Sequence, residues 1–231
     1  MHHFNRHKGT YIALTIILLW CFCLVTAFLI EVDFSNPLIY ILFLFQIHLY
    51  TGLFITAHDA MHGVVSANKP LNKAIGTVSA ALFAYNSYPR LFPKHHLHHR
   101  HVATDEDPDF YHGSFIPWYF KFLMQYVTIW QIILMAITYN VLLLFFPQVN
   151  IILFWIVPSI LATLQLFYFG TYLPHKGEHR ADNKHKARSL QKNHWLAFIS
   201  CYFFGYHYEH HHAPYVPWWQ LYKEKEKQLQ Y

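Results

Sequence analysis

The chain has 231 residues, of which 55% are hydrophobic and 13% are charged, whereas ordinary soluble domains carry about 25% charged residues. A soluble protein with so much apolar surface would expose large apolar patches, so the composition favours an integral membrane protein. The net charge of +5 is modest, and the basic residues flank apolar segments, which argues against a nucleic-acid-binding protein.

Long apolar runs predict four membrane crossings. In chain order they are residues 11–30, residues 38–57, a part of residues 115–146, and residues 151–173. A crossing needs about 20 residues, so the first turns of the 115–146 run are expected along the membrane interface. Pro158 is expected to kink the fourth crossing, as transmembrane helices tolerate. The runs 74–85 and 195–204 are too short to span and suit half-inserted or interfacial helices.

The distribution of positive charge orients these crossings. The links 31–37 and 147–150 contain no Lys or Arg, and all 17 such residues lie on the opposite side or just inside it at Lys121. By the positive-inside rule that side is cytoplasmic. We therefore expect both termini and residues 58–114 and 174–231 there, within one membrane-embedded domain, 1–231. The charged tail "KEKEKQLQY" is expected to be a solvated helix end.

Three histidine motifs fall on this cytoplasmic side. The first, "HDAMH", has two histidines four residues apart, and "HHLHH" and "HYEHH" each contain the spacing H-x-x-H-H. Positions i, i+3 and i+4 share a helical face, so each motif is expected to direct its imidazoles at one point. The residues are His58 and His62, then His95, His98 and His99, and finally His207, His210 and His211.

Histidine is the commonest metal ligand in proteins, and imidazole suits iron, zinc and copper. Eight ligands exceed the four of a tetrahedral zinc site, so the motifs predict two neighbouring metal ions. A ninth candidate is His175, at the end of the fourth crossing, for which His179 and His185 are alternatives. Four further histidines are expected outside the site, because they lie off the repeated spacing or too deep in a helix: His96, His101, His212 and His48.

Metal-ligating histidines usually donate their second ring N–H to a carboxylate or a carbonyl oxygen. Four acidic residues lie in or just beyond the motifs and are candidates for that role: Asp59, Asp107, Asp109 and Glu209. A solvated loop or a helix cap explains each of these acids equally well.

The three motifs resemble those of the membrane fatty acid desaturase and hydroxylase superfamily. More narrowly, the chain resembles the bacterial and cyanobacterial β-carotene ketolases of the four-oxygenase type. The resemblance rests on four strings between residues 52 and 221: "GLFITAHDAMHG", "HHLHHRHVATDEDPDF", "FYFGTYLPHKGEH" and "FFGYHYEHHHAPYVPWWQL". The stretch "ADNKHKARSL" follows the family pattern only loosely, and the long histidine run at 95–101 leaves the register of the second motif open.

The resemblance implies an all-α membrane protein with four transmembrane helices, short interfacial helices and a cytoplasmic histidine-rich cap. It implies two iron ions held by the nine histidines named above, O2 as co-substrate, and electrons from an external donor protein such as a ferredoxin. The implied substrate is a carotenoid that enters from the lipid of a bacterial or cyanobacterial inner or thylakoid membrane. C4 of its β-ionone ring would be hydroxylated twice and dehydrated to a ketone, giving echinenone and then canthaxanthin.

Two groups of alternatives stay open at this point. A β-carotene hydroxylase or a fatty acid desaturase would use the same scaffold. A metal transporter would belong to a different class, but transporters place their ligands near the bilayer midplane, whereas these motifs fall at helix ends on one side.

Overall fold

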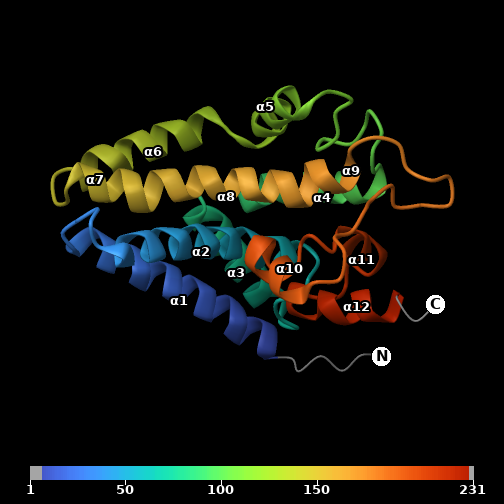
Figure 1. Ribbon diagram of the computed structural model, residues 1–231, viewed down its shortest axis with the longest axis horizontal. Helices are drawn as coiled ribbons and strands as arrows, with labels where there is room; N and C mark the ends of the chain where they lie inside the picture. The colour runs from blue at the N-terminus through green and yellow to red at the C-terminus, as the bar shows by residue number, and fades with distance from the viewer. Residues whose placement is uncertain (1–6, 229–231) are drawn as a thin grey trace.

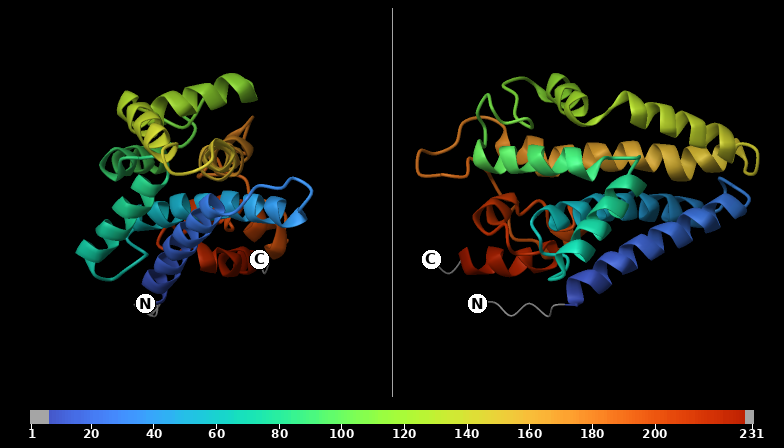
Figure 2. Two further views of the ribbon diagram at one scale, coloured as in Figure 1. Left: turned by 90° about the vertical axis from the view of Figure 1, so that its left-hand side faces the viewer. Right: turned by 180° about the vertical axis from the view of Figure 1, so that it is seen from behind.

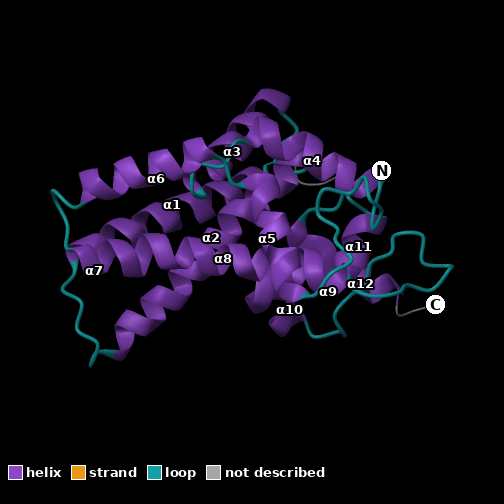
Figure 3. Ribbon diagram, turned by 90° about the horizontal axis from the view of Figure 1, so that it is seen from above, coloured by secondary structure: helices purple, strands orange, loops and turns teal. Residues whose placement is uncertain are grey.

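The computed structural model describes residues 7–228, which form helices and connecting loops without strands (Figure 3). The long helices are α1 (Lys8–Leu29), α2 (Pro37–Met61) and a composite helix that runs from Gln148 to His175. Its parts are α7 (Gln148–Ile151), the π-helical η1 (Ile152–Ile156), α8 (Val157–Phe167), the π-helical η2 (Tyr168–Tyr172) and α9 (Leu173–His175). Each of these three is long and apolar enough to cross a membrane, so the first, second and fourth predicted crossings are confirmed.

The third predicted crossing is broken. Its run forms α5 (Phe115–Tyr126) and α6 (Ile129–Leu142), which meet at an angle of 85°. Thr128 begins α6 with a reciprocal capping box to Gln131, and this cap starts a new helix instead of continuing α5. The first turns of the 115–146 run are expected to lie along the membrane interface. They form the separate helix α5, which agrees with that expectation.

Pro158 lies in the first turn of α8, directly after the π-helical turn η1. A π-helical turn contains one residue more than an α-helical turn, and it shifts the hydrogen-bonding register where proline offers no N–H. Pro158 thus lies within one continuous helix of 28 residues.

Helix α2 lies at the centre of the bundle. Its side chains Tyr50, Leu53 and Ile55 are fully buried and belong to the same apolar core as Trp20 of α1 and Leu166 of the composite helix. By contrast, large apolar side chains such as Phe22, Leu44 and Trp130 are exposed on the outside. An apolar exterior around a packed interior is what a bilayer requires, because lipid tails replace water around the helices.

The remaining helices gather at one end of the bundle, together with the N-terminal end of α1 (Figures 1 and 2). They are α3 (Lys69–Leu82), α4 (Tyr88–Arg100), α10 (His194–Cys201), α11 (His207–His212), η3 (Trp218–Gln220) and α12 (Leu221–Gln228). Helices α3 and α10 correspond to the two apolar runs predicted as too short to span. This end of the molecule carries all three histidine motifs.

Candidate metal centre

Nine histidines meet in two clusters at this end of the bundle. In each cluster one ring nitrogen per residue lies within 4.8 Å of every other. Cluster 1 contains five residues, His58, His62, His95, His99 and His210. Cluster 2 contains four residues, His98, His175, His207 and His211. All nine histidines singled out in the sequence are in these clusters, and His175 is there in place of its two alternatives.

The two H-x-x-H-H motifs are divided between the clusters, which corrects the expectation that each motif points at one place. Histidines at i and i+4 stay together, as His95 with His99 and His207 with His211, whereas His98 and His210 at i+3 enter the opposite cluster. On a helix of 3.6 residues per turn, i+3 and i+4 differ by about 100° in direction. Helices α4 and α11 therefore exchange one histidine each, and every cluster draws on both.

The spacing of the ring nitrogens fits metal coordination. The Nε2 atoms of His99 and His210 are 2.9 Å apart, and that of His211 lies 3.2 Å from His98 and 3.0 Å from His207. A metal–nitrogen bond of about 2.1 Å gives neighbouring ligand nitrogens about 3.0 Å apart at right angles. The Nε2 atoms of His58 and His175 are buried without a hydrogen-bond partner. A metal ion bound within each cluster would give these atoms a partner.

The clusters favour neutral imidazole, the form that binds metal. Burial lowers the pKa of His62 to about 3. Burial and the neighbouring imidazoles also hold the pKa values of His95, His207, His210 and His211 well below their ordinary value. A cluster of unprotonated ring nitrogens at neutral pH is the donor set that imidazole-binding metals need.

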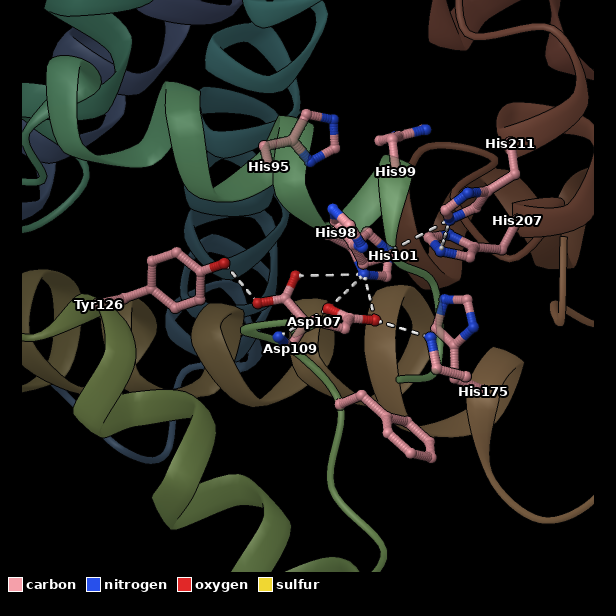
Figure 4. A network of polar contacts seen from close by, with 12 residues as sticks. His95, His98, His99, His101, Asp107, Asp109, Tyr126, His175, His207 and His211 are labelled. Carbon is pink, nitrogen blue, oxygen red and sulfur yellow. Dashed lines mark hydrogen bonds and ion pairs between the residues drawn. The ribbon is translucent and has the colours of Figure 1, made fainter. Parts of the chain in front are cut away.

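His98 is oriented by a carboxylate (Figure 4). Its Nδ1 lies 2.9 and 3.0 Å from the two oxygens of buried Asp107. Burial alone would lower the pKa of His98, but the hydrogen bond and charge of Asp107 raise it. With Nδ1–H donated to Asp107, the Nε2 atom of His98 is directed into cluster 2, as metal-binding histidines are usually held.

Asp109 is close to His98, with 3.9 Å between its Oδ2 and the Nδ1 atom, and its Oδ1 accepts the hydroxyl of Tyr126 (Figure 4). Burial raises the pKa of Asp109 to about 6. Its neighbour Asp107 is held in place by the backbone N–H groups of Ala103 and Asp109. Tyr126 had no signal in the sequence that distinguished it from other interfacial aromatics.

His175 is oriented by a backbone carbonyl that sequence patterns did not indicate. Its Nδ1 lies 2.8 Å from the carbonyl oxygen of Lys186, so its Nε2 points into cluster 2. The segment 186–190 crosses from the end of α9 to the start of α11: the N–H of Arg188 donates to Pro174 and that of Leu190 to Gly205. This segment is "KARSL", within the stretch that followed the family pattern only loosely.

The two other acidic candidates have different partners. Asp59 accepts the backbone N–H of Trp218 at 3.0 Å, while its other oxygen lies 3.5 Å from the Nδ1 of His58. Glu209 is paired with Lys225 at 3.1 Å and accepts the hydroxyl of Ser189. Among the contacts of residues 7–228, Glu209 has none to a histidine ring. The expected orienting role of Glu209 is therefore replaced by a link to α12, and the C-terminal tail is not wholly solvated as predicted.

Histidines outside the repeated spacing lie outside both clusters. His96 is bonded to the Phe92 carbonyl, and His101 is paired with Glu106 at 2.7 Å. His179 and His185 lie in the loop after α9, where His185 faces His212. His48 of α2 is stacked on Tyr202, which follows α10. In the structure the second motif contributes His95, His98 and His99 to the clusters.

An apolar cavity of about 450 Å³ adjoins both clusters. Four cluster residues line it, namely His58, His95, His98 and His207. Its other walls come mainly from the turn after α3 and from α5 and α8, and they include Phe83, Tyr119, Phe122, Leu123, Ile160 and Leu166. Val127 and Ile160 both line the cavity and are exposed on the outer surface, so the cavity reaches the side of the bundle between the α5–α6 bend and α8.

The sequence of this chain is similar to those of known proteins. The fatty acid desaturase family model matches residues 35–133 and 123–229. The β-carotene ketolase of Paracoccus sp. (strain PC1) is 41% identical over 218 residues, which cover 91% of this chain and 90% of that protein. β-Carotene 4-ketolase 3 of Haematococcus lacustris is 39% identical over 81% of this chain and 62% of its own length. The zeaxanthin 4-ketolase of Chlamydomonas reinhardtii is 41% identical over 75% of this chain and 41% of its own length. No solved structure matches the chain significantly.

A helical membrane protein with two buried histidine clusters beside an apolar cavity is of the class of di-metal membrane oxygenases. The chain belongs to the fatty acid desaturase family and, within it, to the β-carotene ketolases.

Proposed function

We propose that this protein oxidises C4 and C4′ of the β-ionone rings of β-carotene to ketones, giving echinenone and then canthaxanthin. The observation that carries the proposal is the pair of four- and five-histidine clusters that line one apolar cavity. A cavity of this kind suits a hydrocarbon ring, and its opening between the α5–α6 bend and α8 would admit the ring directly from the lipid.

The residues fit two metal ions, one in each cluster. The proposed ligands are His58, His62, His95, His99 and His210 for one ion, and His98, His175, His207 and His211 for the other. Two bound iron ions would supply the activation of O2 that C–H oxidation requires and that no side chain provides alone.

The overall chemistry balances with an external reductant. Each hydroxylation converts a C–H bond, O2, two electrons and two protons into C–OH and water. A second hydroxylation at the same carbon gives a geminal diol, which loses water to leave the ketone. Two of the four electrons that each O2 takes up come from the C–H bond, and the other two come from an electron-donor protein.

The role of the protein is to bind and orient the substrate ring and to exclude water from the site. The aromatic and aliphatic wall formed by Phe83, Phe122 and Leu166 holds the ring against the clusters and keeps the site dry. Asp107 and the Lys186 carbonyl fix the tautomers of His98 and His175, so that their Nε2 atoms point inward. We place this end of the molecule on the cytoplasmic side, by the charge distribution.

The test is expression in a β-carotene-accumulating bacterium, followed by chromatography of the pigments. We expect echinenone and canthaxanthin, whereas hydroxylated rings alone would indicate a hydroxylase, and unchanged carotene with desaturated lipids would indicate a desaturase. His98→Ala should reduce bound iron and abolish ketone formation. The variant should still insert into the membrane. His96→Ala, which removes a neighbouring imidazole outside both clusters, is the matched control and should retain activity.

A further inference from the structure

We propose that the pocket between residues 103–113 and 172–191 is the docking site for a small acidic electron-carrier protein. This inference rests on the proposed function, because each hydroxylation consumes two electrons that the carotenoid does not supply. The pocket has a volume of about 1200 Å³ and is separate from the apolar cavity that adjoins the histidine clusters.

Two walls of this pocket are connected to cluster 2 by hydrogen bonds. On one wall Lys186 accepts the Nδ1–H of His175 at 2.8 Å. On the other, the N–H of Ala103 donates to Asp107 at 3.0 Å, and Asp107 in turn holds His98. Electron transfer falls off steeply with distance and is faster through bonds and hydrogen bonds than through gaps. A carrier seated in this pocket would therefore have two short routes to the ligands of one metal ion.

The charge of this pocket fits an acidic partner. The segment 176–192 contains six basic residues against the two acids Glu178 and Asp182, and all six are exposed: Lys176, Arg180, Lys184, Lys186, Arg188 and Lys192. Of these, Lys176, Arg180, Lys186 and Arg188 line the pocket against one acid, Glu178, and Arg180 is paired with Asp182 at 3.0 Å. Arg188 also donates to the carbonyls of Lys176 and Glu178, which stabilises the loop. A cleft with a net positive charge steers an acidic partner to it.

The opposite wall does not cancel this charge. It contributes aromatic residues, including Phe110, Tyr111 and Trp118. The exposed acids of the same loop, Asp105 and Glu106, do not line the pocket and face His112 and His101. Polar and charged groups beside aromatic residues are a common combination in protein interfaces.

The position of the loop favours a soluble protein over lipid head groups. In Figure 1 the orange loop after α9 projects past the ends of all the helices, along the axis of the membrane-spanning bundle. The loop therefore extends away from the bilayer surface. A basic segment that binds anionic lipid would have to lie at that surface.

The experiment uses the purified metal-loaded enzyme in nanodiscs that contain β-carotene, with a reduced acidic [2Fe–2S] ferredoxin as the probe. Arg180→Glu with Lys184→Glu reverses two exposed charges, one on the pocket wall and one on the same loop. Loss of steering should raise the KM for ferredoxin on the order of tenfold and weaken its salt dependence. The iron content, and the rate with dithionite as a small chemical reductant, should not change.

The matched control is Lys69→Glu with Lys73→Glu, an equal charge change on α3, none of whose residues lines the pocket. The docking site is wrong if the loop variant leaves the KM for ferredoxin unchanged, or if the α3 variant raises it equally. It is also wrong if NADPH alone sustains turnover, or if the effect vanishes in nanodiscs without anionic lipid. A wild-type protein that forms no ketone with any reductant would instead overturn the proposed function.

Discussion

His98 shows how much one residue position contributes to this site. It is the i+3 member of its motif, it points to the cluster opposite its neighbours, and its outer nitrogen is the one that a buried carboxylate holds. Rotating the ring or changing its tautomer would remove one ligand from the four-histidine cluster. The carboxylate of Asp107 should therefore matter nearly as much as the histidine.

Asp107→Asn removes the negative charge that orients His98 while keeping the size of the side chain. Loss of such a partner typically weakens metal affinity 10–100-fold, so we expect iron to be lost to a chelator at correspondingly lower concentration. Asp105→Asn changes a fully exposed acid of the same loop and should have no effect. Equal iron retention in the two variants would contradict the role assigned to Asp107.

The ion pair of Glu209 and Lys225 links α11 to α12 next to the histidine clusters. Glu209 is fully buried between His207 and His210, and Lys225 of α12 is its cationic partner. Removing one member of a buried pair leaves an uncompensated charge, which costs about 3–5 kcal/mol, whereas replacing both costs much less.

We therefore expect Lys225→Met to lower thermal stability and iron content strongly, because it leaves the buried carboxylate unpaired. Adding Glu209→Gln to it should restore most of the stability. A double-mutant cycle by thermal unfolding in detergent measures the coupling. Additive effects of the two changes would show that the pair does not hold α11 in place.

At the scale of elements, the π-helical turn η2 determines how the composite helix reaches the site. It precedes α9 directly, and it places Gly170 and Thr171 in the wall of the apolar cavity and His175 in cluster 2. A Cβ atom on Gly170 would lie 2.6 Å from the ring of Phe204. Phe204 in turn packs against His58, His207 and His210, so this glycine allows an aromatic wedge between the clusters.

Gly170→Ala should push Phe204 toward the histidines. Overpacking of this kind typically costs 1–3 kcal/mol, and we expect reduced iron content together with slower ketone formation. Gly170→Ala with Phe204→Leu should recover part of both, since the smaller side chain vacates the space. If Phe204→Leu does not restore iron content or ketone formation, the effect of Gly170→Ala arises in the helix backbone and not from pressure on the clusters.

At the scale of the whole molecule, the bundle buries many imidazoles at one end. Burial lowers the pKa of His62 to about 3 and also lowers those of His95, His99, His207, His210 and His211. In the metal-free protein these rings stay neutral, while the same rings in the unfolded chain bind protons below their ordinary value of 6.5. His98 has the opposite sign, because Asp107 raises its pKa.

The metal-free protein should therefore keep its full stability above about pH 6.5 and lose it as the pH falls toward 3. Each histidine that is protonated only in the unfolded chain contributes a slope of about 1.4 kcal/mol per pH unit. Thermal unfolding of the chelator-treated protein between pH 8 and 4 tests this expectation. A melting temperature that rises on acidification would contradict it, as it would mean that proton uptake by the folded state dominates.

The sequence by itself determined the class of fold and the identity of the histidines. Hydropathy and helical spacing are local properties, so three crossings and all nine cluster histidines were found without knowledge of the packing. The repeated spacing also favoured a place for His96 and His101 outside the clusters, but it left the register of the second motif open.

Only the tertiary structure decided how these residues combine. The exchange of His98 and His210 between the clusters, the Lys186 carbonyl on His175, and the pairing of Glu209 with Lys225 all join different helices or loops. Spacing along one helix gives directions relative to that helix alone. The point at which two such directions meet depends on how α2, α4, α9 and α11 pack, and that packing is set by side-chain contacts across the whole bundle.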